Sequence, residues 1–87
     1  MDYIDLKVWR QSMDLVERIY ELAKTLLKVE TYALSDHIRR VVVSVPSNIA
    51  EGQNRNTNKE FIQFLYIALG SIPEVETQLM IGKRLDL

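Results

Sequence analysis

The 87-residue sequence contains no cysteine, and this absence removes several kinds of chemistry at once. Disulfides, thiol catalysis and thiolate metal sites all require that side chain. His37 is the only histidine, so a histidine-rich metal site cannot be built within one copy of the chain. We expect no metal site, and the lack of cysteine fits the reducing interior of a cell.

Neither sign of charge is in marked excess, since 11 Lys and Arg residues face 12 Asp and Glu residues. The whole molecule therefore carries no field that would attract nucleic acid or a membrane, and a basic site must come from local clustering. The longest uncharged stretch, residues 61–73, is shorter than a membrane span of ~20 residues. The first residues also lack the apolar run of a secretory signal. We expect a single cytoplasmic domain, residues 1–87, that is not associated with a membrane.

Catalytic motifs are also missing. The sequence has no glycine-rich phosphate loop and no nucleophile elbow. Glu74 and Glu76 do not share a helical face, and Glu51 has no carboxylate partner, so nothing indicates paired acid–base catalysis. We therefore expect that the protein is not an enzyme and uses no cofactor.

Helical periodicity dominates what is present. Residues 6–28 carry apolar side chains at spacings of three and four, which predicts a first helix. A similar pattern predicts a second helix over residues 33–51, ending at Gly52, because glycine is common just past a helix C-terminus. Pro46 lies inside this helix and is expected to bend it.

A capping box, Thr57 to Glu60, predicts the start of a third helix over residues 58–85. Gly70 and Pro73 interrupt this segment and predict a kink or break near residues 70–73. Its predicted inner face repeats at spacings 4-3-4-3-4 and consists of Phe61, Leu65, Ala68, Ile72, Val75 and Leu79.

The predicted fold is therefore all-α, an antiparallel up-down helical bundle of the four-helix-bundle type. Three long helices are present, and each has an apolar face too broad for one neighbour to cover. Uncovered apolar surface of this kind usually marks an interface. We expect the fourth helix to be absent or supplied by a neighbouring subunit.

A polar stripe follows the second predicted helix. Arg40, Ser44, Ser47 and Glu51 lie at spacings 4-3-4, and Asn48 flanks them. Such a stripe can contact a ligand, a nucleic acid or a subunit. It can equally be an exposed helix face or a buried polar network that fixes helix register, and these ordinary interpretations are the more common ones.

Four cations form the candidate nucleic-acid site: Arg39, Arg40, Arg55 and Lys59. Phosphate contact requires only clustered cations and tolerates loose geometry. However, acidic residues are interspersed, and Arg39 and Arg40 lie more than three helical turns from Arg55. Within one chain these cations are expected to be salt-bridge partners, whereas a ring of subunits would repeat them into a stronger field.

The sequence resembles the ribosomal RNA intervening-sequence proteins, a bacterial family of four-helix bundles. The motifs that carry the resemblance are Asp5-Leu-Lys-Val-Trp9, Ile38-Arg-Arg40, Val45-Pro-Ser-Asn-Ile-Ala-Glu-Gly52, Lys59-Glu-Phe61, Phe64-Leu-Tyr-Ile-Ala-Leu-Gly-Ser71 and Glu74-Val-Glu-Thr-Gln-Leu79. The resemblance implies a homo-oligomeric ring, typically a homopentamer, without enzymatic activity. Similar proteins continue into another helix and usually have an ordinary helix former where this chain has Pro73.

Similar proteins that serve as accessory proteins of diversity-generating retroelements bind nucleic acid and a reverse transcriptase. On that resemblance Arg39, Arg40 and Arg55 are expected to contact phosphate. The signature residues Pro46, Asn48 and Glu51 are expected to shape the bundle or the subunit contact. The main hypothesis is thus a self-associating protein that binds structured RNA or DNA, and the alternative is a protein-interaction scaffold with no nucleic-acid role.

Overall fold

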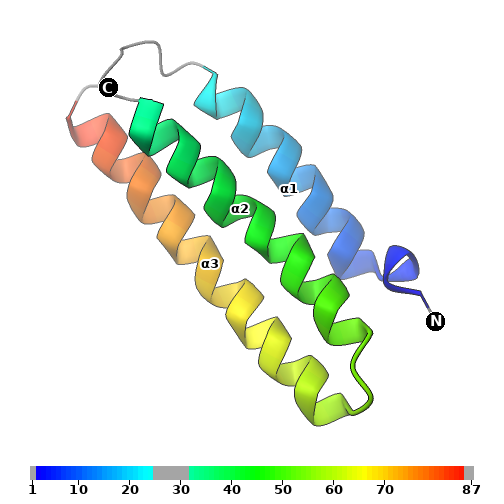
Figure 1. Cartoon of the computed structure of the whole chain (residues 1–87). Coiled ribbons are helices and arrows are strands. Elements are labelled where there is room, and N and C mark those ends of the chain that lie inside the picture. Colours follow the sequence, from blue (N-terminus) through cyan, green and yellow to red (C-terminus); the bar gives the residue numbers. More distant parts are fainter. Residues whose placement is uncertain (1, 25–31, 86–87) are drawn as a thin grey trace.

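The computed structural model describes residues 2–24 and 32–85, and within these ranges the chain is helical and contains no strand. The all-α class is therefore confirmed for the described residues. In chain order the elements are the 3-10 helix η1 (Tyr3–Asp5) and the α-helices α1 (Lys7–Ala23), α2 (Tyr32–Gln53) and α3 (Asn58–Arg84). Figure 1 shows the α-helices side by side, with α2 between α1 and α3. The predicted end of the first helix, at residue 28, lies outside the described residues.

The apolar residues of α2 hold the molecule together. Ile38 and Val42 have no exposed surface, and they pack with Ile19 of α1 and Val75 of α3. Burying side chains of this size stabilises the fold by about 1.5–3 kcal/mol each. The β-branched run that begins at Val41 is helical, and its member Val42 is fully buried in this core, where packing outweighs strand propensity.

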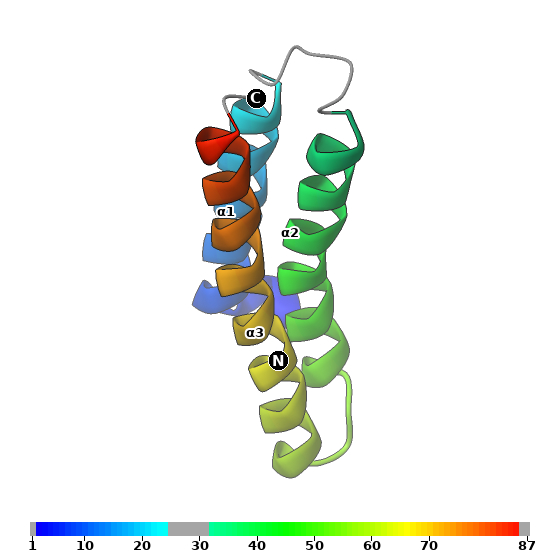
Figure 2. The same ribbon diagram turned by 90° about the vertical axis from the view of Figure 1, so that its left-hand side faces the viewer.

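α1 and α3 each pack on α2 rather than on each other. Figure 2, turned by 90°, shows α2 on one side and both other helices on the opposite side. A second apolar cluster, built on Val45, Ile49 and Ala68, also joins α2 to its neighbours, and Trp9 of α1 packs against it. The arrangement leaves a gap between α1 and α3 that α2 closes from one side only.

Pro46 and Gly52 have structural roles in α2 that differ from simple helix breaking. α2 is continuous through Pro46, which is buried beside Trp9 and Met13 of α1. The predicted helix end at Gly52 is wrong, because α2 continues to Gln53. A Cβ atom on Gly52 would lie 2.6 Å from the Cβ of Phe64, so glycine is needed here to let α3 approach closely.

The predicted start of α3 is confirmed. The backbone N–H of Glu60 donates to Oγ1 of Thr57 at 3.2 Å, and the Thr57 hydroxyl donates to the Glu60 carboxylate at the same distance. Of the kink or break predicted near residues 70–73, the break is wrong, since α3 is helical throughout. Pro73 is exposed, whereas Ser71 and Val75 are buried, so packing on α2 holds both halves of α3 in one helix.

Two glycine substitutions separate close packing from chain flexibility. We expect Gly52→Ala to destabilise the protein by about 1–3 kcal/mol, because the added methyl group overlaps Phe64. Gly70→Ala is the matched control, since its Cβ would meet nothing within 4 Å. That substitution should stabilise the helix by about 0.5–1 kcal/mol. Urea unfolding of both variants measures the difference, and equal effects at the two positions would contradict the close-approach explanation.

Candidate functional site

A long apolar groove of about 500 Å³ runs between α1 and α3, with α2 as its floor. Only Gln11 and Ser12 contribute polar side chains to it. The remaining lining residues are Val8, Leu15, Val45, Ile49, Leu65, Ala68, Leu69 and Ile72. Because α1 and α3 do not close over this surface, the groove leaves apolar side chains of all three helices open to a partner.

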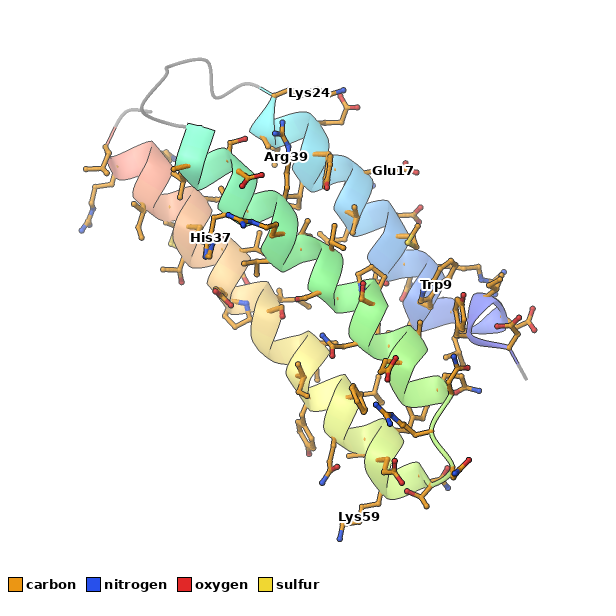
Figure 3. All side chains as sticks on the ribbon, in the orientation of Figure 1. Trp9, Glu17, Lys24, His37, Arg39 and Lys59 are labelled. Atoms are coloured by element: carbon orange, nitrogen blue, oxygen red, sulfur yellow. The ribbon has the colours of Figure 1, made fainter. Side chains whose placement is uncertain are left out.

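Arg39 lies between α1 and α2 and is half-buried (Figure 3). Its guanidinium carbon is 5.5 Å from the centre of the Tyr20 ring, within the range of a cation–π contact. Its Nε atom is buried and has no hydrogen-bond partner among the described residues. Arg39 therefore helps to join α1 to α2, which restricts how far its side chain can turn toward a phosphate.

Arg40 is exposed and forms an ion pair of 2.9 Å with Asp36, one helical turn earlier. It also lines a shallow hollow of about 410 Å³ on the α2–α3 face. Across this hollow, His37 Nε2 lies 3.8 Å from a carboxylate oxygen of Glu74. Since the hollow holds groups of both signs, a single chain offers little net positive charge here.

Arg55 lies just beyond the C-terminus of α2 and is held by two contacts. One guanidinium nitrogen donates to the Glu51 carboxylate at 2.5 Å, and the guanidinium carbon lies 4.9 Å from the centre of the Phe64 ring. Lys59, in the first turn of α3, is exposed and has no ion-pair partner within residues 2–24 and 32–85. Of the four candidate cations, Lys59 is therefore the one with neither an ion pair nor a cation–π contact among the described residues.

The four cations do not form one patch. Figure 3 shows Arg39 between α1 and α2 and Lys59 at the far end of the molecule, where α3 begins. Arg39 and Arg40 are separated from Arg55 by the last part of α2, and the segment from Arg40 to Gln53 alone spans about 20 Å at a rise of about 1.5 Å per residue. A continuous phosphate-binding surface thus requires more than one copy of the chain or a long nucleic acid.

The predicted polar stripe of α2 divides into exposed and half-buried parts. Ser47 is exposed, and its hydroxyl donates to the Val43 carbonyl within α2. Ser44 is half-buried, and its hydroxyl lies 2.7 Å from that of Ser71 on α3. Asn48 donates to the Ser44 carbonyl at 2.7 Å. The inner part of the stripe is therefore a polar network that links two helices and fixes their register.

The other signature residues also serve packing. Trp9 is half-buried, and its ring meets that of Tyr3 edge to face, with ring centres 5.4 Å apart. Glu51 neutralises Arg55, while Pro46 and Gly52 are buried at helix contacts. Within one chain these residues make helix contacts and an exposed ion pair, and the geometry does not assign them a ligand.

Sequence reasoning missed two buried polar residues of α3, Ser71 and Gln78. Ser71 precedes Glu74 by three residues, as the cap of a new helix would, yet it is buried and bonded to Ser44. Gln78 is buried as well, and its side-chain oxygen lacks a hydrogen-bond partner among the described residues. The available signal was spacing, because Ser71 and Gln78 are seven residues apart and therefore share a face with the apolar residues of α3.

The Ser44–Ser71 bond can be measured with a double-mutant cycle. We expect Ser71→Ala to lower the free energy of unfolding by about 1 kcal/mol, and the cycle with Ser44→Ala to give a coupling of about 0.5–1.5 kcal/mol. A parallel cycle that pairs Ser71→Ala with Ser47→Ala is the control and should be additive, because Ser47 bonds only within its own helix. Additivity in both cycles would exclude an energetic role for the bond.

Two further features are absent from the described part of the chain. No helix within residues 2–24 and 32–85 has both the length and the hydropathy to cross a membrane. The same residues contain no group of three or more histidine or acidic side chains placed to hold a metal ion.

Comparison with known proteins shows the family of the chain. No individual curated protein matches it significantly. The model of the family described as 23S rRNA-intervening sequence protein, by contrast, matches residues 4–87, almost the whole length. The resemblance drawn from the sequence motifs is confirmed, and the helical structure is consistent with it. The chain belongs to the 23S rRNA-intervening sequence protein family.

Proposed function

We propose that this protein is a non-catalytic, cytoplasmic, self-associating helical bundle that binds structured RNA or DNA through arginines repeated around an oligomer. The observation that carries the proposal is the amount of apolar surface left open on α3. Tyr66 is 71% exposed, Leu69 59% and Ile62 50%. Side chains of this size on one helix form an extended apolar surface, and such surfaces usually mark an interface.

The sequence of α3 explains why residues 2–24 and 32–85 leave this surface uncovered. Residues 61–73 carry no charge, so apolar side chains point in most directions around the helix. α2 covers only the side that includes Ala68 and Val75. A helix that is apolar nearly all round is normally buried on more than one side. Association with a further helix would supply the missing contact.

The groove between α1 and α3 supports the same proposal. In an antiparallel up-down bundle of the four-helix type, a fourth helix would pack against both outer helices, and the groove is a surface that such a helix would cover. Its floor and walls are almost entirely apolar. We infer that a helix from a neighbouring subunit or another protein fills this place and completes the bundle.

The nucleic-acid part of the proposal rests on the exposed cations. Arg40 retains 72% side-chain exposure and Arg55 42%, despite their ion pairs with Asp36 and Glu51. Exposed ion pairs one turn apart contribute only about 0.3–0.5 kcal/mol, so a phosphate can replace the carboxylate at little cost. Repetition of Arg39, Arg40, Arg55 and Lys59 in each subunit would then create the field that one copy lacks.

A protein-interaction scaffold is the second candidate, and a specific observation favours it. Asp36 and Glu51 already neutralise two of the four cations within each chain. An apolar groove without charged residues in its lining suits a protein partner, because the core of a protein interface is typically poor in charged residues.

The solution mass tests self-association directly. We expect light scattering to give a multiple of the 10.1 kDa chain mass that is stable on dilution to micromolar concentration. A ring of the kind implied by the family resemblance would give five times this mass. A compact monomer at high concentration would contradict self-association and, with it, the repeated display of arginines.

RNA binding at several salt concentrations separates the two candidate functions. We expect binding whose logarithm falls linearly with the logarithm of salt concentration, because phosphate contacts release counterions. Arg40→Gln should reduce that slope by about 0.7–0.9 for each phosphate that the arginine neutralises, whereas Arg18→Gln, an exposed position on α1, should not. Binding without a salt slope, or no binding at low salt, would leave the scaffold as the better description.

A further inference from the structure

The connection between α2 and α3, residues 53–59, differs in composition from the rest of the chain, and we call it the tip. It reads Gln-Asn-Arg-Asn-Thr-Asn-Lys and contains no acidic and no apolar residue. Three of the chain's four asparagines lie in it. Residues 54–59 are all exposed, and Figures 1 and 2 show the tip at one end of the molecule, beyond the end of α1. The tip is therefore a protruding polar surface that carries two cations.

The side-chain amides of Asn54, Asn56 and Asn58 have no hydrogen-bond partner among the described residues. Thr57 and Arg55, by contrast, are held by the capping box and by an ion pair. Asparagine usually favours a turn because its side chain bonds to nearby backbone groups. The three amides do not serve the turn in this way, so each keeps donors and an acceptor for a ligand.

The acidic residues on either side of the tip are engaged within the chain. Glu51 pairs with Arg55, and Glu60 belongs to the capping box. Lys59 forms no ion pair within the described residues. The guanidinium of Arg55 lies over the Phe64 ring, and its side chain remains 42% exposed. Nucleic-acid bases stack on guanidinium planes as they do on aromatic rings. The tip thus combines amides that can bind bases with cations that can bind phosphate.

The shape of the tip favours unpaired bases over a duplex. The deep, narrow major groove of an RNA helix is closed to side chains, whereas bases in loops and bulges present their hydrogen-bonding edges. An asparagine amide matches adenine, because it donates to N7 and accepts from the N6 amino group at the same time. The asparagine side chain is short, so the base has to approach the backbone closely, and a protruding turn permits that approach.

We propose that the tip recognises unpaired adenines in single-stranded loops of the bound nucleic acid. The amides of Asn54, Asn56 and Asn58 bind the base edges. Arg55 stacks on a base, and Lys59 contacts phosphate. The proposal rests on the nucleic-acid binding proposed above and names the element that selects the sequence. In a ring of the kind that the family resemblance implies, symmetry repeats the tip in every subunit, so one long strand can contact several tips.

Hairpins that share one stem and differ only in the loop test base recognition. We expect the protein to bind an all-adenine loop about tenfold more tightly than an all-uracil loop, measured by fluorescence anisotropy at constant salt. The same stem with all-adenine and all-thymine loops in DNA shows whether the sugar matters. Adenine preference in either series supports the proposal, and its absence from both would overturn it.

Substitutions separate base recognition from phosphate contact. Asn54→Ala, Asn56→Ala and Asn58→Ala, combined in one chain, should abolish the adenine preference and leave the salt slope unchanged, because an amide carries no charge. Lys59→Gln should lower the slope by about 0.7–0.9 and weaken binding to both hairpins equally. Gln11→Ala is the matched control, since it removes an exposed amide of α1, outside the tip, and should change neither property.

A substitution in the nucleic acid tests the same contact without altering the protein. Purine has the adenine ring system but lacks the N6 amino group. We expect a purine loop to bind the wild-type protein about tenfold more weakly than an adenine loop, and the triple asparagine variant not to distinguish the two. Urea unfolding of the triple variant should match the wild type, because the three amides make no bond within the described residues. If it does not, the purine loops still decide, since they need only the wild-type protein.

The outcomes distinguish this proposal from the broader one. Absence of binding to every hairpin at low salt would overturn nucleic-acid binding as a whole. Salt-dependent binding without adenine preference would overturn only base recognition by the tip and leave nucleic-acid binding standing. An adenine preference that survives in a folded triple variant would do the same, and so would equal binding of purine and adenine loops to the wild-type protein.

Discussion

α2 has to bury its apolar residues against two helices at once, and the rest of the structure follows from that constraint. Ile38 and Val42 are fully buried because α1 and α3 cover them from different sides. The two outer helices consequently lie against α2 and not against each other. Their remaining apolar side chains border an open groove, so the same packing that stabilises the chain also leaves apolar surface uncovered.

Polar and small residues position α3 on α2 along this contact. Gly52 permits the backbone of α2 to approach Phe64, and the Ser44–Ser71 bond fixes the register nearly two helical turns away. At the same end of the contact between α2 and α3, the Arg55 guanidinium lies over the Phe64 ring. Each of these contacts acts over a short range. Together they determine which side of α3 faces α2 and which side remains exposed.

The sequence predicted the features that depend on local periodicity and capping. The inner face of α3 and its start at the Thr57–Glu60 capping box follow from residue spacing alone. The functions of Gly52 and Ser71 could not be predicted, because they depend on which residue of another helix lies opposite. The break expected at Pro73 fails for a similar reason: packing on both sides of an exposed proline outweighs a helix penalty of about 3 kcal/mol. The sequence identified which cations are candidates. Their separation in space and the aromatic contacts of Arg39 and Arg55 became visible only in the structure.

Association and nucleic-acid binding are physically linked in the proposed function. Within one chain, Arg40 and Arg55 are balanced by carboxylates one turn away, so bringing copies together adds cations and anions in equal number. A positive field would arise only where the assembly buries acidic residues and leaves basic residues exposed. In the proposed function Arg40 and Arg55 would supply such basic groups, because both keep exposed side-chain surface beside their carboxylate partners.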